Sequence, residues 1–387
     1  MPSYQLYDHV PSSDDLHGTE ILDEKPLPAR PCSQHEWSRY IRTIYFVATV
    51  VLVLLVGFGL GFATGTHHIS SSTSAPVSSP APASSPVSSS SPATSSSAST
   101  STSVTCTDPY FRKEWRSLSK DEKKDYLDAF QCLIDSPSGI GLNGSLYNDM
   151  SWVHNLVAHS THGKAPFLTW HRRFIFVYEK YLRTKCGYKG AVPFWDWSLD
   201  WEDPMASPIF DPETGFGGDG DSNGPMHDGT HCVTDLPFKN MTPQWLGEKY
   251  DPHCLTRWFS DDWLAHYLNP ESLETIMAAT TYSEFFLALE MRAHDIIPMG
   301  IRGDFTSFTA PNDPIFYLHH SQLDRIWWLW QMRDKANRLH DYSGEGDGGR
   351  NVTLSDVLPL AGLDSDVTVA DIMDTEGGEM CYRYMYQ

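Results

Sequence analysis

The chain has 387 residues, which is enough for one large domain with appended segments. Its formal net charge is −21, and 13% of its residues are aromatic. The charge argues against nucleic-acid binding, because neutralising phosphates requires clustered Lys and Arg.

The first part of the chain has the pattern of a membrane anchor. Residues 1–43 are polar and lack a periodic apolar pattern, so we expect a disordered tail. Residues 44–63 are uncharged and apolar throughout. A helix of this length, at about 1.5 Å per residue, matches a bilayer core of about 30 Å. We therefore predict a transmembrane signal anchor. A buried core helix is the alternative, but neither flank offers it a packing partner.

The charges on either side of this segment predict its orientation. Arg30, Arg39 and Arg42 precede it, and no further Lys or Arg occurs before Arg112. The positive-inside rule then places the N-terminus in the cytosol and the rest of this single-pass protein in the lumen or outside the cell. Residues 64–105, rich in Ser, Thr and Pro, are expected to form a disordered, O-glycosylated stalk.

Glycosylation and cysteine patterns fit an oxidising compartment. N-glycosylation sequons begin at Asn143, Asn240 and Asn351, although Pro243 weakens the second. Cys32 stands alone before the apolar segment. The six later cysteines permit three disulfides with fifteen connectivities. They are Cys106, Cys132, Cys186, Cys232, Cys254 and Cys381.

Residues 106–387 have the pattern of a mainly α domain with long loops. Ser119 stands three residues before Glu122, the spacing of a capping box, which predicts a helix start. Residues 198–256 are rich in Gly, Asp and Pro, which predicts a long irregular region. Helices are predicted at residues 113–118, 119–133, 149–158, 171–182, 272–279, 282–294 and 321–338.

Histidines are concentrated in two places. One is the pair His319–His320, which precedes an aromatic, helix-like run. Taken alone, this pair favours core histidines of a buried helix over metal ligands. Imidazole nitrogens are good copper ligands, and ligands from separate helices can converge in the core of a bundle. The other group is His154, His159, His162 and His171.

Two motifs resemble the copper signatures of tyrosinases. The first is His162-x4-Phe167-Leu168-x-Trp170-His171-Arg172, with Glu179 eight positions after His171. The second is Asp313-Pro314-x-Phe316-Tyr317-x2-His320-x3-Asp324. Blocks resembling other parts of that family are Pro193-Phe194-Trp195-Asp196-Trp197 and Tyr382-Arg383-Tyr384. The resemblance covers residues 106–387 and implies a helical-bundle, dicopper tyrosinase-like core.

The resemblance also implies which histidines bind metal. In tyrosinases two copper ions are each held by three histidines. Here the first ion would be held by His154, His162 and His171, with His159 as the competitor for the first position. The second would take His294 and His320.

The second site departs from the family pattern. A histidine is expected four residues after His294, but Pro298 stands there and offers no ligand atom. His319 could supply the missing ligand, although a helical start would point it away. A histidine of the irregular region, His227 or His231, could substitute. We favour a third outcome, a weakened or altered second copper site.

Other positions bear on mechanism. Asp295 follows His294 where phenol-hydroxylating relatives often carry Asn, and it could accept a proton or simply cap a turn. Ser160 stands where some fungal members have a cysteine linked to a histidine, so no such crosslink is expected. Glu179 and Asp324 are interpreted as groups that orient their neighbours.

These features predict a membrane-anchored, tyrosinase-like copper oxidoreductase that oxidises phenols or catechols with O2. The anchor, stalk and compact core resemble tyrosinase-like proteins of fungal ribosomal cyclic-peptide pathways of the ustiloxin and phomopsin type. That resemblance implies a tyrosine-containing peptide as substrate, with a phenolic small molecule as the simpler choice. The alternatives are a copper- or oxygen-binding protein without turnover, as in haemocyanins, and a degenerate scaffold.

Overall fold

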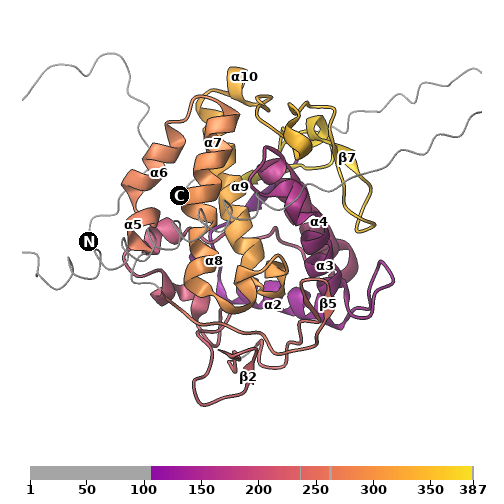
Figure 1. The fold of residues 1–387 in the computed structure, drawn as a ribbon, viewed down its shortest axis with the longest axis vertical. Helices are drawn as coiled ribbons and strands as arrows, with labels where there is room; N and C mark the ends of the chain where they lie inside the picture. Colours follow the sequence, from indigo (N-terminus) through magenta and orange to yellow (C-terminus); the bar gives the residue numbers. More distant parts are fainter. Residues whose placement is uncertain (1–105, 236, 261–263, 386–387) are drawn as a thin grey trace, which may run out of the picture. The chain divides into compact units, whose positions relative to one another are not determined.

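The computed structural model describes residues 106–235, 237–260 and 264–385 (Figure 1). The predicted tail, anchor and stalk at residues 1–105 lie outside this part of the chain. Within the described ranges, no helix combines the length and apolarity needed to cross a bilayer.

A group of long helices forms the centre of the domain, as the sequence predicts (Figure 1). Helix α4 (Pro166–Cys186) packs against α2 (Lys120–Asp135), α3 (Leu146–Thr161) and α9 (Ile315–Arg333). Shorter helices surround this core. They are α5 (Ala265–Leu268), α6 (Pro270–Met277), α7 (Tyr282–Leu289), α8 (Ile296–Ile301) and α10 (Lys335–Arg338).

The strands are short and lie at the edges of the helical core. Strand β1 (Tyr110–Arg112) pairs in parallel with β8 (Tyr382–Tyr384), so the two ends of the domain lie side by side. The remaining strands form three antiparallel pairs in the described residues. These are β2 (Met226–His227) with β3 (Thr230–His231), β4 (Trp245–Leu246) with β5 (Lys249–Tyr250), and β6 (Val357–Leu358) with β7 (Val367–Thr368).

Local sequence signals account for the ends of the central helices. Ser119 and Glu122 form the predicted reciprocal capping box at the start of α2. Helix α4 begins with Pro166 in its first turn and ends at Gly187, which has a φ of 73°. These signals act over a few residues, which is why the sequence predicts them well.

Three helix predictions need correction. Residues 113–118 contain only a 3-10 turn at Trp115–Ser117, because Glu114 is held in an isolated bridge with Phe194. The helix predicted at 282–294 is α7 followed by a π-helical turn at Glu290–His294. The helix predicted at 321–338 begins earlier, at Ile315, and ends at Arg333 before α10.

The early start of α9 matters for the site. Pro314 is the N-cap of this helix. His319 and His320 therefore lie inside α9, and both are buried. Their rings lie 5.3 Å apart with planes at 75°.

All six cysteines after residue 105 form disulfides, as predicted. The bond Cys106–Cys381 joins the ends of the domain beside the β1–β8 pair. The other two bonds are Cys132–Cys186, which links α2 to the end of α4, and Cys232–Cys254 in the irregular region.

A buried ionic cluster holds α4, α9 and the C-terminal strand together. Asp324 of α9 accepts hydrogen bonds from Arg172 (2.5 Å) and from the hydroxyl of Tyr384 (2.6 Å). Arg112 of β1 lies between Asp324 and Glu179, at 3.3 Å and 3.0 Å. Both carboxylates therefore have the structural role predicted from the sequence.

Candidate metal centre

Three histidines from α3 and α4 form the first cluster. His154 lies within α3, His162 is the C-cap of that helix, and His171 lies in the second turn of α4. One ring nitrogen from each lies within 4.8 Å of the others. The Nε2 atoms of His154 and His171 are 3.1 Å apart.

Main-chain carbonyl groups orient all three rings. A carbonyl oxygen can only accept, so each Nδ1 must carry the proton and each Nε2 is left with its lone pair. A hydrogen bond from the ring nitrogen that does not bind the metal, here Nδ1, is typical of metal-binding histidines. The pairs are His154 with Phe308 (2.7 Å), His162 with Ala158 (3.1 Å) and His171 with Phe167 (2.6 Å).

A second cluster contains His294, His319 and His320, with ligand nitrogens again within 4.8 Å of one another. His294 ends the π-helical turn, and its Nδ1 lies 2.9 Å from a carboxylate oxygen of Asp295. In the described part of the chain, no ring nitrogen of His319 or His320 has a hydrogen-bond partner. Buried polar atoms without partners are costly, so these nitrogens are suited to a ligand.

The two clusters adjoin each other. The rings of His171 and His320 stack with centroids 4.3 Å apart and planes 12° apart. On the other side, His162 and His294 lie 5.7 Å apart. Six imidazoles therefore surround one small volume, an arrangement suited to a pair of cations.

Burial keeps five of the six imidazoles neutral. Desolvation lowers the pKa of His154 to about 4 and that of His162 to about 2. The pKa values of His171, His319 and His320 also lie well below the usual value, again chiefly because of burial. Neutral imidazole is the form that binds metal ions, so the set of donors fits copper at neutral pH.

A cavity of about 480 Å³ opens over the histidines. Its walls are mostly apolar, which suits an aromatic ring. Several of the apolar wall residues are also exposed to solvent, so the cavity has an apolar rim. The apolar wall residues include Leu287, Met291, Pro298, Met299, Phe305 and Phe308.

Glu290 is a functional candidate that the sequence reading missed. It is buried in the cavity wall, where its Oε1 accepts the main-chain N–H of Gly163 (2.7 Å). Its Oε2 has no hydrogen-bond partner among the described residues. Desolvation raises the pKa of this carboxyl to about 8. In the sequence, the only signal of a functional role for Glu290 is its position four residues before His294.

The structure also places the competing histidines. His159 lies outside both clusters, and its exposed ring packs on Phe308 with centroids 5.2 Å apart. His319, predicted to point away, lies instead in the second cluster with His294 and His320.

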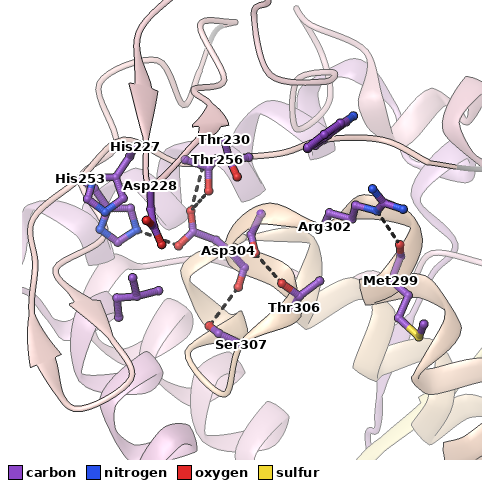
Figure 2. Close-up of a pocket in the computed structure, with 13 residues that line it drawn as sticks. His227, Asp228, Thr230, His253, Thr256, Met299, Arg302, Asp304, Thr306 and Ser307 are labelled. Carbon is purple, nitrogen blue, oxygen red and sulfur yellow. Dashed lines mark hydrogen bonds and ion pairs between the residues drawn. The ribbon is translucent and has the colours of Figure 1, made fainter. Parts of the chain in front are cut away.

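Two histidines of the irregular region, His227 and His253, line a different pocket (Figure 2). His227 stacks on His253 with centroids 4.5 Å apart, and His253 binds Asp304 at 2.8 Å. Neither His227 nor His231 belongs to the second cluster. The pocket, of about 590 Å³, adjoins the metal cavity through shared wall residues such as Met299.

The fold and the two histidine clusters define a class of dicopper oxidase, and the chain belongs to the tyrosinase family. Residues 144–333 match the family profile described as the common central domain of tyrosinase. Members of this family bind two copper ions and use phenolic substrates and O2. The chain is therefore a copper oxidoreductase of the tyrosinase and polyphenol oxidase type.

Individual relatives support this assignment. The tyrosinase-like protein phomQ1 of Diaporthe leptostromiformis is 43% identical over 305 residues, covering 72% of this chain and 78% of the relative. Tyrosinase ustQ of Aspergillus flavus is 41% identical over 287 residues, covering 72% and 80%. A mutant polyphenol oxidase of Thermothelomyces thermophila superposes with a TM-score of 0.65 at 28% identity, covering 72% and 89%.

Proposed function

We propose that this chain oxidises a phenol or catechol with O2 at a copper pair. The first ion is held by His154, His162 and His171, and the second by His294 and His320. The observation that carries this proposal is the facing pair of Nε2 atoms in His154 and His171. Both have lone pairs and lie 3.1 Å apart, a contact that a shared cation relieves.

When bound, the copper pair supplies the transfer of electrons between the phenol and dioxygen. The protein supplies a fixed set of imidazoles. Main-chain carbonyls aim His154, His162 and His171, and Asp295 aims His294. The apolar rim, with Met291 and Phe308, contacts the aromatic ring and excludes water around it.

Glu290 handles the proton of the phenol. A carboxyl group whose pKa lies near neutrality can accept or release a proton beside a bound substrate. Bound dications nearby lower that pKa, which favours the carboxylate and therefore its action as a base. Asp295 instead serves to orient His294.

The experiment uses the full-length chain purified in detergent. Copper content per chain and turnover of 4-tert-butylcatechol are measured on the same sample. Two coppers with turnover support the oxidase. Two coppers without turnover would support a carrier of copper or oxygen, and one or none would support a degenerate scaffold.

We propose, further, that the substrate is a tyrosine in a peptide and that the domain faces the lumen or the exterior, anchored by residues 44–63. Three disulfides in the described domain support an oxidising compartment. The charge asymmetry around residues 44–63 supports the orientation. Protease protection of microsomes tests the topology. Mass spectrometry of a tyrosine peptide tests the reaction by the gain of an oxygen atom or the loss of two hydrogens.

A further inference from the structure

The second metal site has one ligand fewer than the first if only His294 and His320 are counted. The position from which the family pattern expects another imidazole is occupied by Pro298 in helix α8, and proline has no ligand atom. Pro298 instead forms part of the apolar cavity wall. Any third protein ligand must therefore come from elsewhere in the fold.

His319 is placed to supply it. Its ring is fully buried, and one ring nitrogen lies within 4.8 Å of the ligand atoms of His294 and His320. The rings of His319 and His294 lie 5.6 Å apart and within 24° of parallel. Nitrogens that share one ion lie about 3–4 Å apart when metal–nitrogen distances are about 2.0 Å. Small side-chain rotations therefore close the site.

The burial of His319 also fits a ligand. Neither of its ring nitrogens has a hydrogen-bond partner among the described residues. A buried polar atom without a partner is costly, and a bound ion would satisfy one of these nitrogens.

We propose that His319 is the third ligand of the second copper ion, so that two adjacent residues of one helix bind the same metal. This inference rests on the proposed dicopper function. The rings of His319 and His320 lie 5.3 Å apart with planes at 75°, so an ion in the wedge between them can be reached from both. His294 completes the site from the π-helical turn, a distortion that commonly occurs at functional sites.

Asp295, His227 and His253 are engaged or belong to another pocket. A carboxylate oxygen of Asp295 is already paired with Nδ1 of His294. His227 and His253 belong to the neighbouring pocket of Figure 2. Within the described ranges, only the two histidine clusters bring three possible metal ligands together.

If His319 replaces the imidazole that the family pattern expects at position 298, the shape of the cavity beside the second ion changes. Pro298 lines the cavity, whereas His319 is fully buried and does not line it. The wall beside the second copper is then apolar instead of carrying an imidazole. This leaves more room for a bulky substituent on the phenol.

The test compares copper content in the full-length chain and its His319→Gln variant. Copper per chain is measured by atomic absorption after equilibration with a graded copper buffer. We expect the native chain to hold two coppers. We expect the variant to lose affinity for one of them by more than about 100-fold, since even outer-sphere partners change affinity by about 10–100-fold. His159→Gln, which removes an exposed imidazole outside both clusters, is the matched control.

A rescue variant separates ligand loss from a folding defect. His319→Gln combined with Pro298→His returns an imidazole at the family position and is expected to restore the second copper. Retention of both coppers at native affinity by His319→Gln alone would overturn the inference while leaving the proposed function intact. A native chain without copper would instead overturn the proposed function.

A measurement on the unmodified chain decides the matter if the variants do not fold. A crystal structure of the copper-loaded protein, with anomalous scattering to locate both ions, reports the distance from His319 to the second ion. We expect a nitrogen at about 2.0 Å. A separation that leaves His319 outside the coordination sphere would reject the assignment.

Discussion

The Nε2 atoms of His154 and His171 face each other at 3.1 Å, although they belong to different helices. The Nδ1 of each ring is committed to a main-chain carbonyl, of Phe308 and Phe167 respectively. Neither Nε2 can therefore donate to the other. The site is thus arranged around a cation.

Removing copper is expected to destabilise the domain. A ligand present at 1,000 times its dissociation constant stabilises the native state by about 4 kcal/mol, which corresponds to about 10 °C in the unfolding midpoint of a domain of this size. Calorimetry before and after chelation of copper measures the shift. Reloading with copper should recover the midpoint, and reloading with Mg2+ should not, because imidazole prefers the softer ion. An unchanged midpoint would mean that the native state does not bind copper more tightly than the unfolded chain does.

Glu290→Gln is expected to slow phenol oxidation by about 10²–10⁴-fold, the usual contribution of a positioned acid or base. The amide keeps the shape of the side chain but cannot take up the proton of the phenol. Turnover and copper content are measured together, and both coppers should be retained. The control is Glu271→Gln, an exposed carboxyl on α6. Full activity of the Glu290 variant would remove this residue from the mechanism.

Asp324→Asn is expected to cost about 3–5 kcal/mol of unfolding free energy, because it leaves buried arginines without their counter-charge. Arg172 and Arg112 are fully buried and both bind this carboxylate. Asp128→Asn is the matched control, since it removes the exposed pair with Lys124 and should cost no more than about 1 kcal/mol. Urea titrations of both variants measure the difference. Equal losses would contradict the assigned role of the cluster.

The carboxylate of Asp324 should also affect how the free energy of unfolding changes at acidic pH. Burial alone would raise the pKa of Asp324, but Arg172 and then Arg112 hold it below the usual value. A depressed pKa in the folded state stabilises the protein above the unfolded pKa, and this stabilisation is lost as the pH falls through the folded value. The unfolding free energy of the native chain should therefore fall more steeply between about pH 5 and pH 2 than that of Asp324→Asn. Parallel curves would argue against this coupling.

The disulfide between the ends of the domain should contribute more than the short one. Cys106–Cys381 spans 275 residues and Cys232–Cys254 spans 22. In the chain-entropy account, this difference in loop length corresponds to about 2 kcal/mol. Replacing each pair by serines and measuring the unfolding free energy compares them. A larger loss of unfolding free energy on replacing Cys232–Cys254 would show that contacts in the folded state, and not loop closure, determine the contribution of each disulfide.

How much the sequence predicts depends on the range of the interactions involved. The helix start at Ser119 and the motif histidines His162 and His171 follow from signals within a few positions of one another. The membership of the six later cysteines in disulfides also follows from the sequence, but their pairing does not. Cys106 and Cys381 are 275 positions apart and are joined only because β1 and β8 pair.

By itself, the amino-acid sequence determined the family, the helical core, the motif histidines and the irregularity of the second site at Pro298. Tertiary structure alone decided that His319 faces His294 and that Glu290 enters the cavity wall. The physical reason is that a helix start depends on near neighbours, whereas the direction of a side chain into a site depends on packing. Helix α9 packs against the π-helical turn that ends at His294, and this packing sets the directions of His294 and His319.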